Sequence, residues 1–197
     1  AQAGAITADQ ASNLLFQAQL ASQEAMKQAA LELAGYIRTE ILGKGAKYVA
    51  VMNFPNPAST PSGAATAAAN PAAGALLTTL ADTFNLWLRE GLTGQPVMIV
   101  DLRTLFTSVV ATPATYGIAN ATVPACDATK IATLTHNQVT DGKSLFCNVT
   151  PGSPLNSLRD GADPLTWFFA DGNHPSTGGH KVLSDNILKQ MQAAGWI

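Results

Sequence analysis

The chain carries little charge and no strongly basic region. Only 12% of its 197 residues are charged, and the formal net charge is −2. A surface that binds nucleic acid needs clustered Lys and Arg to neutralise phosphates, so we expect no nucleic-acid partner. Apolar residues make up 47% of the chain, but no uninterrupted apolar run reaches the length of a membrane span. We therefore expect no transmembrane span either.

Cysteine is equally scarce, since the sequence holds only Cys126 and Cys147. They enclose a segment rich in Thr, Asn, Gly and Asp, and that polarity favours a disulfide over two unrelated buried thiols. Closing this loop would stabilise the fold by about 3 kcal/mol in the chain-entropy model. A disulfide indicates an oxidising compartment, so a secreted or periplasmic location is expected.

The length and the apolar patterning predict one α/β domain segment over residues 1–197. A capping box at Thr7 and Gln10 predicts the start of a long helix, and Gly43 and Gly45 predict its end. Apolar residues recur along this helix at spacings of three and four. We expect this stripe to pack in the core; it consists of Leu14, Ala18, Ala21, Ala25, Ala29, Leu33, Ile37 and Ile41.

The rest of the chain alternates between strand and helix patterns. Continuous apolar runs predict buried parallel strands at residues 48–52, 96–101 and 166–170. Helical spacing predicts helices at residues 72–90, 102–110 and 177–194. Residues 58–71 and the long segment 112–164 lack either pattern, and we expect surface loops there. A substrate pocket would be formed by that long segment together with residues 53–61.

The most informative stretch is residues 167–177 (WFFADGNHPST), in which Asp171 and His174 follow an apolar run. Ser176 or Thr177 is the expected N-cap of the next helix. This turn would lie at the carboxyl edge of the sheet, where open α/β sheets place their sites. A histidine can accept a proton from a hydroxyl, and a nearby carboxylate can hold the required tautomer.

Two other interpretations of this turn remain open at the level of sequence. Asp171 could simply cap the turn, with His174 as an ordinary loop residue. Asp171, His174 and His180 could also ligate a metal, although no further ligand lies nearby in the sequence. His136 lies in the segment between the cysteines and is expected to be an exposed loop residue.

Residues 171–175 resemble the last signature block of the SGNH, or GDSL, hydrolases, which is Asp-x-x-His-Pro after an apolar strand. Other segments are similar to the secreted bacterial GDSL esterases and phospholipases. These are residues 45–55 (GAKYVAVMNFP), Thr60-Pro61, Phe84-Asn85 with Leu88, Val100-Asp101-Leu102 through Phe106, and residues 113–118 (PATYGI).

The resemblance implies a flavodoxin-like α/β/α sandwich with a parallel sheet, the SGNH hydrolase fold, with this chain as its C-terminal part. It implies a carboxylic-ester hydrolase (esterase, lipase or phospholipase) without metal or organic cofactor. The substrate would be a small-molecule or lipid ester. Asp171 would be the orienting acid and His174 the general base of a Ser-His-Asp triad.

The family's Gly-Asp-Ser block, which carries the nucleophile, is absent from residues 1–197. Residues 142–145 (GKSL) resemble that block in letters only, so we do not expect Ser144 to be the nucleophile. The serine is expected on an N-terminal segment of the same domain. The alternative is a non-catalytic module that binds a lipid, a glycan or a protein, with Asp171 and His174 as relics of a lost site.

Overall fold

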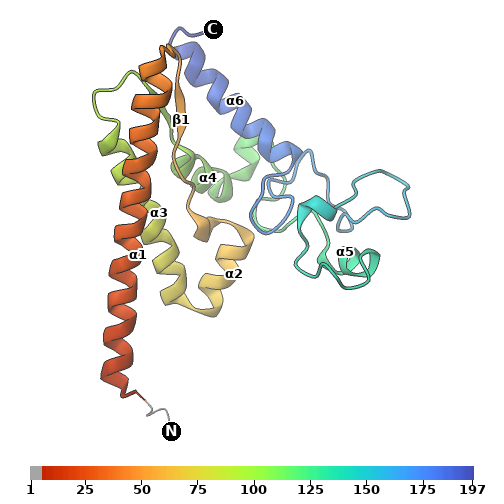
Figure 1. Cartoon of the computed structure of the whole chain (residues 1–197). Helices are drawn as coiled ribbons and strands as arrows, with labels where there is room; N and C mark the ends of the chain where they lie inside the picture. Colours follow the sequence, from red (N-terminus) through yellow and green to blue (C-terminus); the bar gives the residue numbers. More distant parts are fainter. Residues whose placement is uncertain (1–5) are drawn as a thin grey trace.

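A computed structural model describes residues 6–197, and they adopt an α/β fold (Figure 1). Two short parallel strands lie between helices, and short 3-10 turns join several of the elements. The strands are β1 (Ala50–Met52) and β2 (Met98–Val100). The helices are α1 (Ala8–Tyr36), α2 (Pro61–Ala69), α3 (Pro71–Gly91), α4 (Leu102–Ala111), α5 (Ala128–Leu134) and α6 (Thr177–Ala193).

The predicted ends of the first helix are confirmed. Thr7 and Gln10 form the capping box, with each side chain bonded to the other's main-chain N–H. After Tyr36 the chain continues through a π-helical turn (Ile37–Ile41) and a 3-10 turn (Leu42–Lys44). It stops at Gly45, whose φ of 93° lies in the left-handed region that favours glycine.

The expected core packing of the apolar stripe on α1 is wrong for most of its length. Leu14 is 60% exposed, and Leu33 and Ile41 are exposed as well. Of the stripe only Ile37 is buried, and Ala30 and Ala34 form the rest of the buried face. The reason is that α1 packs mainly along one partner, α3, as Figure 1 shows, so a narrow face of small residues is covered.

Residues of β1 and β2 pair in parallel, with Val51 opposite Ile99. The two predicted strands are therefore confirmed, although each is shorter than expected. Val51 and Ile99 contribute to an apolar cluster with α1 and α3. Val100 and Met98 contribute to a second cluster with α4, α6 and Phe168-Phe169. Successive strand residues point to opposite faces, so helices cover both faces of the strand β2.

The expected third strand at residues 166–170 is not formed. Phe168 and Phe169 are fully buried, as a core strand would be, but this stretch makes only isolated bridges. Its main-chain groups are paired with irregular segments: the Phe168 N–H donates to the Asn120 carbonyl at 2.7 Å, and Phe169 accepts from Ala125 at 2.9 Å. The sheet of the described residues therefore has two strands.

Helices α2 and α5 lie in segments that we expected to be loops. Thr60 caps α2 by accepting the Gly63 N–H at 3.1 Å, and Pro61 occupies the first helical position. A capping residue followed by proline is a helix-start signal, although proline also marks turns. Asp127 caps α5 in the same way, accepting from Thr129 and Lys130.

Within residues 6–197, no helix is both long enough and apolar enough to cross a membrane. Their apolar clusters lie at the sheet, whereas residues 120–165, which include α5, form an extension beside it (Figure 1).

Candidate active site

Side chains tie together the two points at which the strands end. Asn53 follows β1, and its amide donates to the Asp101 carboxylate at 2.8 Å. Asp101 follows β2 and caps α4 by accepting the Thr104 N–H at 3.1 Å. Burial acts to raise the pKa of Asp101, but the hydrogen bonds from Thr104 and Asn53 outweigh it, and the pKa is lowered. The carboxyl edge of the sheet is thus a fixed frame.

The segment after β1 continues from this frame to the Asp171–His174 turn. Asn85 of α3 holds Phe54 at both main-chain groups, with two hydrogen bonds of 2.7 Å. Further along, the Ser62 N–H at the start of α2 donates to the Gly172 carbonyl at 2.9 Å. The contact is so close that a side chain at Gly172 would collide with the Ser62 hydroxyl. The start of α2 therefore packs directly on the turn.

The start of α6 fixes the turn from its other side. Ser176, one of the two predicted candidates, is the N-cap and accepts the Gly179 N–H at 3.2 Å. Its hydroxyl also donates to the carbonyls of Pro164 and Trp167. A side chain at Gly179 would collide with the Phe168 carbonyl, so glycine lets α6 approach the buried aromatic run closely. The two ends of the turn are thus anchored in the core.

Asp171 and His174 contact one another within this turn. The His174 Nδ1 atom lies 2.9 Å from both carboxylate oxygens of Asp171. Main-chain N–H groups surround the same carboxylate: Asn173 and His174 donate to Oδ1 at 2.9 and 2.8 Å, and Ser144 donates to Oδ2 at 2.9 Å. The carboxylate therefore receives donors from its own turn and from a distant segment.

These donors determine the charge of Asp171. Its side chain is 5% exposed, and such burial acts to raise the pKa. The N–H groups of Asn173, Ser144 and His174 outweigh the burial and hold the pKa well below its ordinary range. An ionised carboxylate only accepts hydrogen bonds, so Nδ1 of His174 must be the protonated nitrogen. In the neutral ring, Nε2 is then the nitrogen free to accept a proton.

The His174 side chain is 70% exposed, although its Nδ1 atom faces a buried acid. No serine or threonine hydroxyl bonds to this ring within residues 6–197. The pair therefore resembles an oriented base without a bound partner. Comparisons with protein-family models and with curated proteins find no match to this chain. Its function must therefore be argued from this site.

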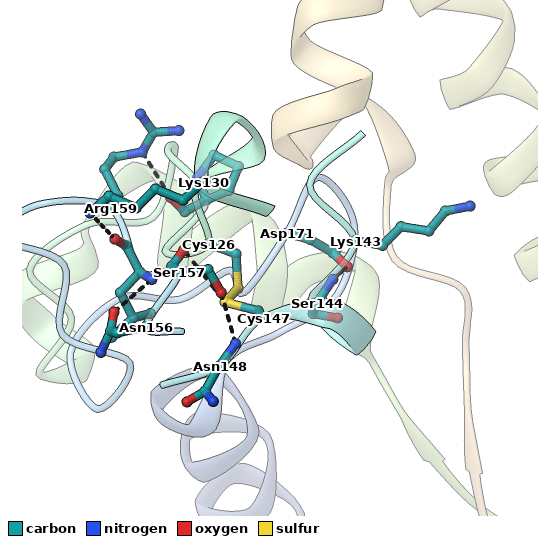
Figure 2. The surroundings of a disulfide bond; sticks show 12 residues. Cys126, Lys130, Lys143, Ser144, Cys147, Asn148, Asn156, Ser157, Arg159 and Asp171 are labelled. Carbon is teal, nitrogen blue, oxygen red and sulfur yellow. Dashed lines mark hydrogen bonds between the residues drawn. A yellow bond between two sulfur atoms is a disulfide. The ribbon is translucent and has the colours of Figure 1, made fainter. Parts of the chain in front are cut away.

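Ser144 is the residue whose position the sequence did not predict. We considered its hydroxyl as a nucleophile, but the contact that the structure shows is made by its main-chain N–H, which donates to the Asp171 carboxylate (Figure 2). The disulfide expected between Cys126 and Cys147 is formed, with the Cα atoms 5.8 Å apart. The polar segment enclosed by the cysteines folds back against the turn. In the sequence, the predicted pairing of the two cysteines was the one sign of this folding.

The other histidines do not join the pair. His180 lies at the start of α6 and lines a separate cavity of about 260 Å³ together with Ser144 and Pro175. In the described part of the chain, no three His, Cys, Asp or Glu side chains are grouped as a metal site requires. His136 is exposed in a loop, with a φ of 51°, which confirms the expected loop position.

A cavity of about 330 Å³ adjoins the turn at Gly172. Pro61, Ser62 and Ala65 of α2 line one side, and the long segment lines the other, including Val123 and Pro124. Its size lies near the lower end of the range for ligand pockets. Of residues 53–61, which we expected to form a pocket wall, only Pro61 lines this cavity, and helix α2 supplies the rest of that side.

Proposed function

We propose that this chain carries the acid and the base of a serine ester hydrolase of the SGNH (GDSL) type. The supporting observation is the Asp171–His174 pair, in which an ionised, buried carboxylate directs the unprotonated Nε2 outward. Such an arrangement suits proton transfer from a hydroxyl. A residue that merely capped its turn would not need an imidazole in contact with both carboxylate oxygens.

In the proposed mechanism, Nε2 of His174 takes the proton from a serine hydroxyl as its oxygen attacks the ester carbonyl. Asp171 remains ionised and stabilises the imidazolium that forms. The imidazolium then gives the proton to the departing alcohol, which leaves an acyl-enzyme. Water attacks the acyl-enzyme with the same assistance from His174. The products are a carboxylic acid and the regenerated serine.

We propose that the serine and the oxyanion donors lie on a polypeptide segment outside residues 1–197. The absence of a hydroxyl at the His174 ring within residues 6–197 supports this, as does the exposed position of the ring. In that arrangement the chain would be the C-terminal part of a flavodoxin-like sandwich. The cavity beside Gly172 would take part of a small-molecule or lipid ester, and the disulfide supports a secreted or periplasmic location.

The test uses the complete natural polypeptide that contains this sequence. A fluorophosphonate probe, which labels activated serines, and a p-nitrophenyl ester report on nucleophile and turnover. We expect labelling of one serine and ester hydrolysis, with both abolished in His174→Ala. Asp171→Asn should lower kcat by about a thousandfold or more, as expected for loss of the orienting acid. His136→Ala, an exposed histidine remote in sequence from the turn, is the control.

Two outcomes would count against the hydrolase. Serine labelling that persists in His174→Ala would show that this histidine is not the base. A folded natural polypeptide without label or turnover would favour the alternative, a binding module with a relic pair. Lipid, glycan and protein binding would then be the properties to assay.

A further inference from the structure

The third donor to Asp171 comes from a segment with few apolar anchors of its own. Ser144 begins a single 3-10 turn, Ser144–Phe146. The Leu145 side chain is 85% exposed, and Phe146 is 45% exposed. Hydrophobic burial therefore does little to hold this turn against Asp171. Another constraint must fix the position of the Ser144 N–H.

That constraint is a closed circuit of contacts through the disulfide, and Figure 2 shows the part that runs from Cys126 through Cys147 and Ser144 to Asp171. The Cys126 N–H donates to the carbonyl of Ala170 at 2.9 Å, and Ala170 directly precedes Asp171. Cys126 is bonded to Cys147, which directly follows the 3-10 turn and donates its N–H to the Ser144 carbonyl at 3.0 Å. The Ser144 N–H then donates to the Asp171 carboxylate at 2.9 Å. The disulfide therefore joins both ends of this contact.

We propose that the main-chain N–H of Ser144 is a positioning group for the Asp171–His174 pair, held in place by the Cys126–Cys147 disulfide. Its effect on catalysis rests on the proposed hydrolase function, whereas its effect on the pair itself does not. Oδ1 of Asp171 is bound by two N–H groups of its own turn. Among the described residues, Ser144 is the one main-chain donor to Oδ2, and it therefore fixes one of the two oxygens that the imidazole contacts.

A proline at this position removes the N–H donor and also the hydroxyl, whose hydrogen bond contributes less to lowering the pKa of Asp171. Ser144 is the first residue of its helical turn, where proline is tolerated because its fixed φ suits a helix start. Lys143 before it has φ −54° and ψ 132°, the extended conformation that a residue before proline adopts. Ser144→Pro therefore deletes the N–H, whereas Ser144→Ala keeps the N–H and deletes only the hydroxyl. Leu145→Ala is the exposed neighbouring control.

The first readout is NMR of the complete natural polypeptide, and it needs no ester turnover. The Nδ1–H proton of His174 should give a strongly downfield resonance while it is bound to an ionised carboxylate. In Ser144→Pro we expect this resonance to broaden or move upfield, and the pKa of Asp171 to rise by about 1 to 2 pH units. Ser144→Ala should change both by less. Equal effects of the two substitutions, or no effect of proline, would overturn the proposal.

The second readout is turnover by the complete natural polypeptide. We expect kcat in Ser144→Pro to fall by about 10- to 100-fold with KM little changed, and Leu145→Ala to retain full activity. If no variant or parent protein turns over an ester, the hydrolase proposal fails while the NMR comparison still decides the positioning role. A proline variant with unchanged kcat in an active enzyme would refute the catalytic part.

A third measurement needs no substitution at Ser144 and covers a proline variant that does not fold. In the unaltered chain, the Ser144 amide should exchange with solvent at least tenfold more slowly than an unbonded amide. Reduction of the disulfide, or Cys126→Ser with Cys147→Ser, should remove that protection and shift the His174 resonance in the same direction as proline does. An unprotected Ser144 amide in the oxidised protein would disprove the contact.

Discussion

At the scale of single residues, Asp171 is held more tightly than the histidine that it orients. Three main-chain N–H groups and one imidazole surround its carboxylate, and the side chain is nearly inaccessible. His174, in contrast, exposes most of its ring. This division suits a pair in which one member stays ionised and fixed while the other exchanges a proton with a reacting group.

The lowered pKa of Asp171 makes a prediction about stability in acid. A carboxyl group whose pKa is lower in the folded state stabilises fully above its unfolded pKa, about 3.9, and loses this contribution as pH falls toward the folded value. Unfolding free energy should therefore drop between pH 4 and pH 3 by about 1 kcal/mol more in the parent chain than in Asp171→Asn. Urea midpoints at both pH values measure this.

Asp185→Asn is the matched control, because Asp185 lies on the exposed side of α6, where it pairs with Lys181. It should keep the acid dependence of the parent. Equal pH dependence in Asp171→Asn and the parent would show that the N–H donors do not stabilise the ionised form of Asp171.

At the scale of elements, the contact between α1 and α3 depends on the absence of side chains. Ala30 and Ala34 of α1 are fully buried, and Gly91 ends α3 opposite them. A Cβ atom at Gly91 would lie 2.7 Å from the Cβ of Ala34, which is closer than two carbon atoms pack. The helices can therefore approach each other only while this position stays small.

Gly91→Ala should lower the unfolding free energy by about 1 to 3 kcal/mol, since overpacking at a close contact forces the helices apart. Chemical denaturation with circular dichroism measures the change. Gly35→Ala is the control, and we expect it to raise the unfolding free energy. A Cβ atom at Gly35 meets nothing within 4 Å, and alanine is the better helix former by about 1 kcal/mol. Destabilisation by both substitutions would contradict this account of the contact.

Local signals determined which elements could be predicted. The capping box at Thr7 and the N-cap at Ser176 depend on a few adjacent residues, and both were predicted. The prediction of a strand at 166–170 was wrong because an apolar run indicates burial but does not show which strand would pair with it. The prediction that the α1 stripe packs in the core was wrong for most of its length. An apolar helix face favours packing, but the sequence does not show which other elements lie against it. Helix α2 was missed because its Thr60-Pro61 start was interpreted as a turn.

In the candidate site, too, local contacts could be predicted from the sequence and long-range contacts could not. Asp171 and His174 are three positions apart, so their contact was within reach of a sequence pattern. Ser144 reaches the same carboxylate across 27 positions, and no local pattern encodes that contact. The disulfide suggested only that the intervening segment folds back. Which main-chain group would meet the acid required the three-dimensional structure.

At the scale of the whole molecule, two kinds of stabilisation occupy different regions. Apolar clusters on the two faces of the sheet hold α1, α3, α4 and α6. The extension that includes α5 relies more on polar contacts, such as Lys130, which donates to the Leu158 carbonyl at 2.8 Å. Ser157 is fully buried and bonds to Asn148 at 2.8 Å. The disulfide crosslinks this second region.

Reduction of the disulfide should therefore destabilise the extension that includes α5 more than the helices packed on the sheet. We expect a loss of about 3 kcal/mol in unfolding free energy, from the entropy that the open chain regains. Hydrogen exchange should rise in residues 127–158 and stay unchanged in α3, because α3 is held by an apolar cluster. Exchange that rises equally in both regions would show that the crosslink supports the whole fold and not this extension.

The Thr60 hydroxyl lies 3.3 Å from Asn173 across 113 positions of sequence. Contacts between segments so distant along the chain carry the largest entropic cost of closure, and they tend to form late. Helices joined by near neighbours can therefore assemble before the start of α2 docks on the turn that carries Asp171 and His174. Incompletely folded copies of the protein would retain most of their helical content and yet lack the long-range contacts that fix this turn.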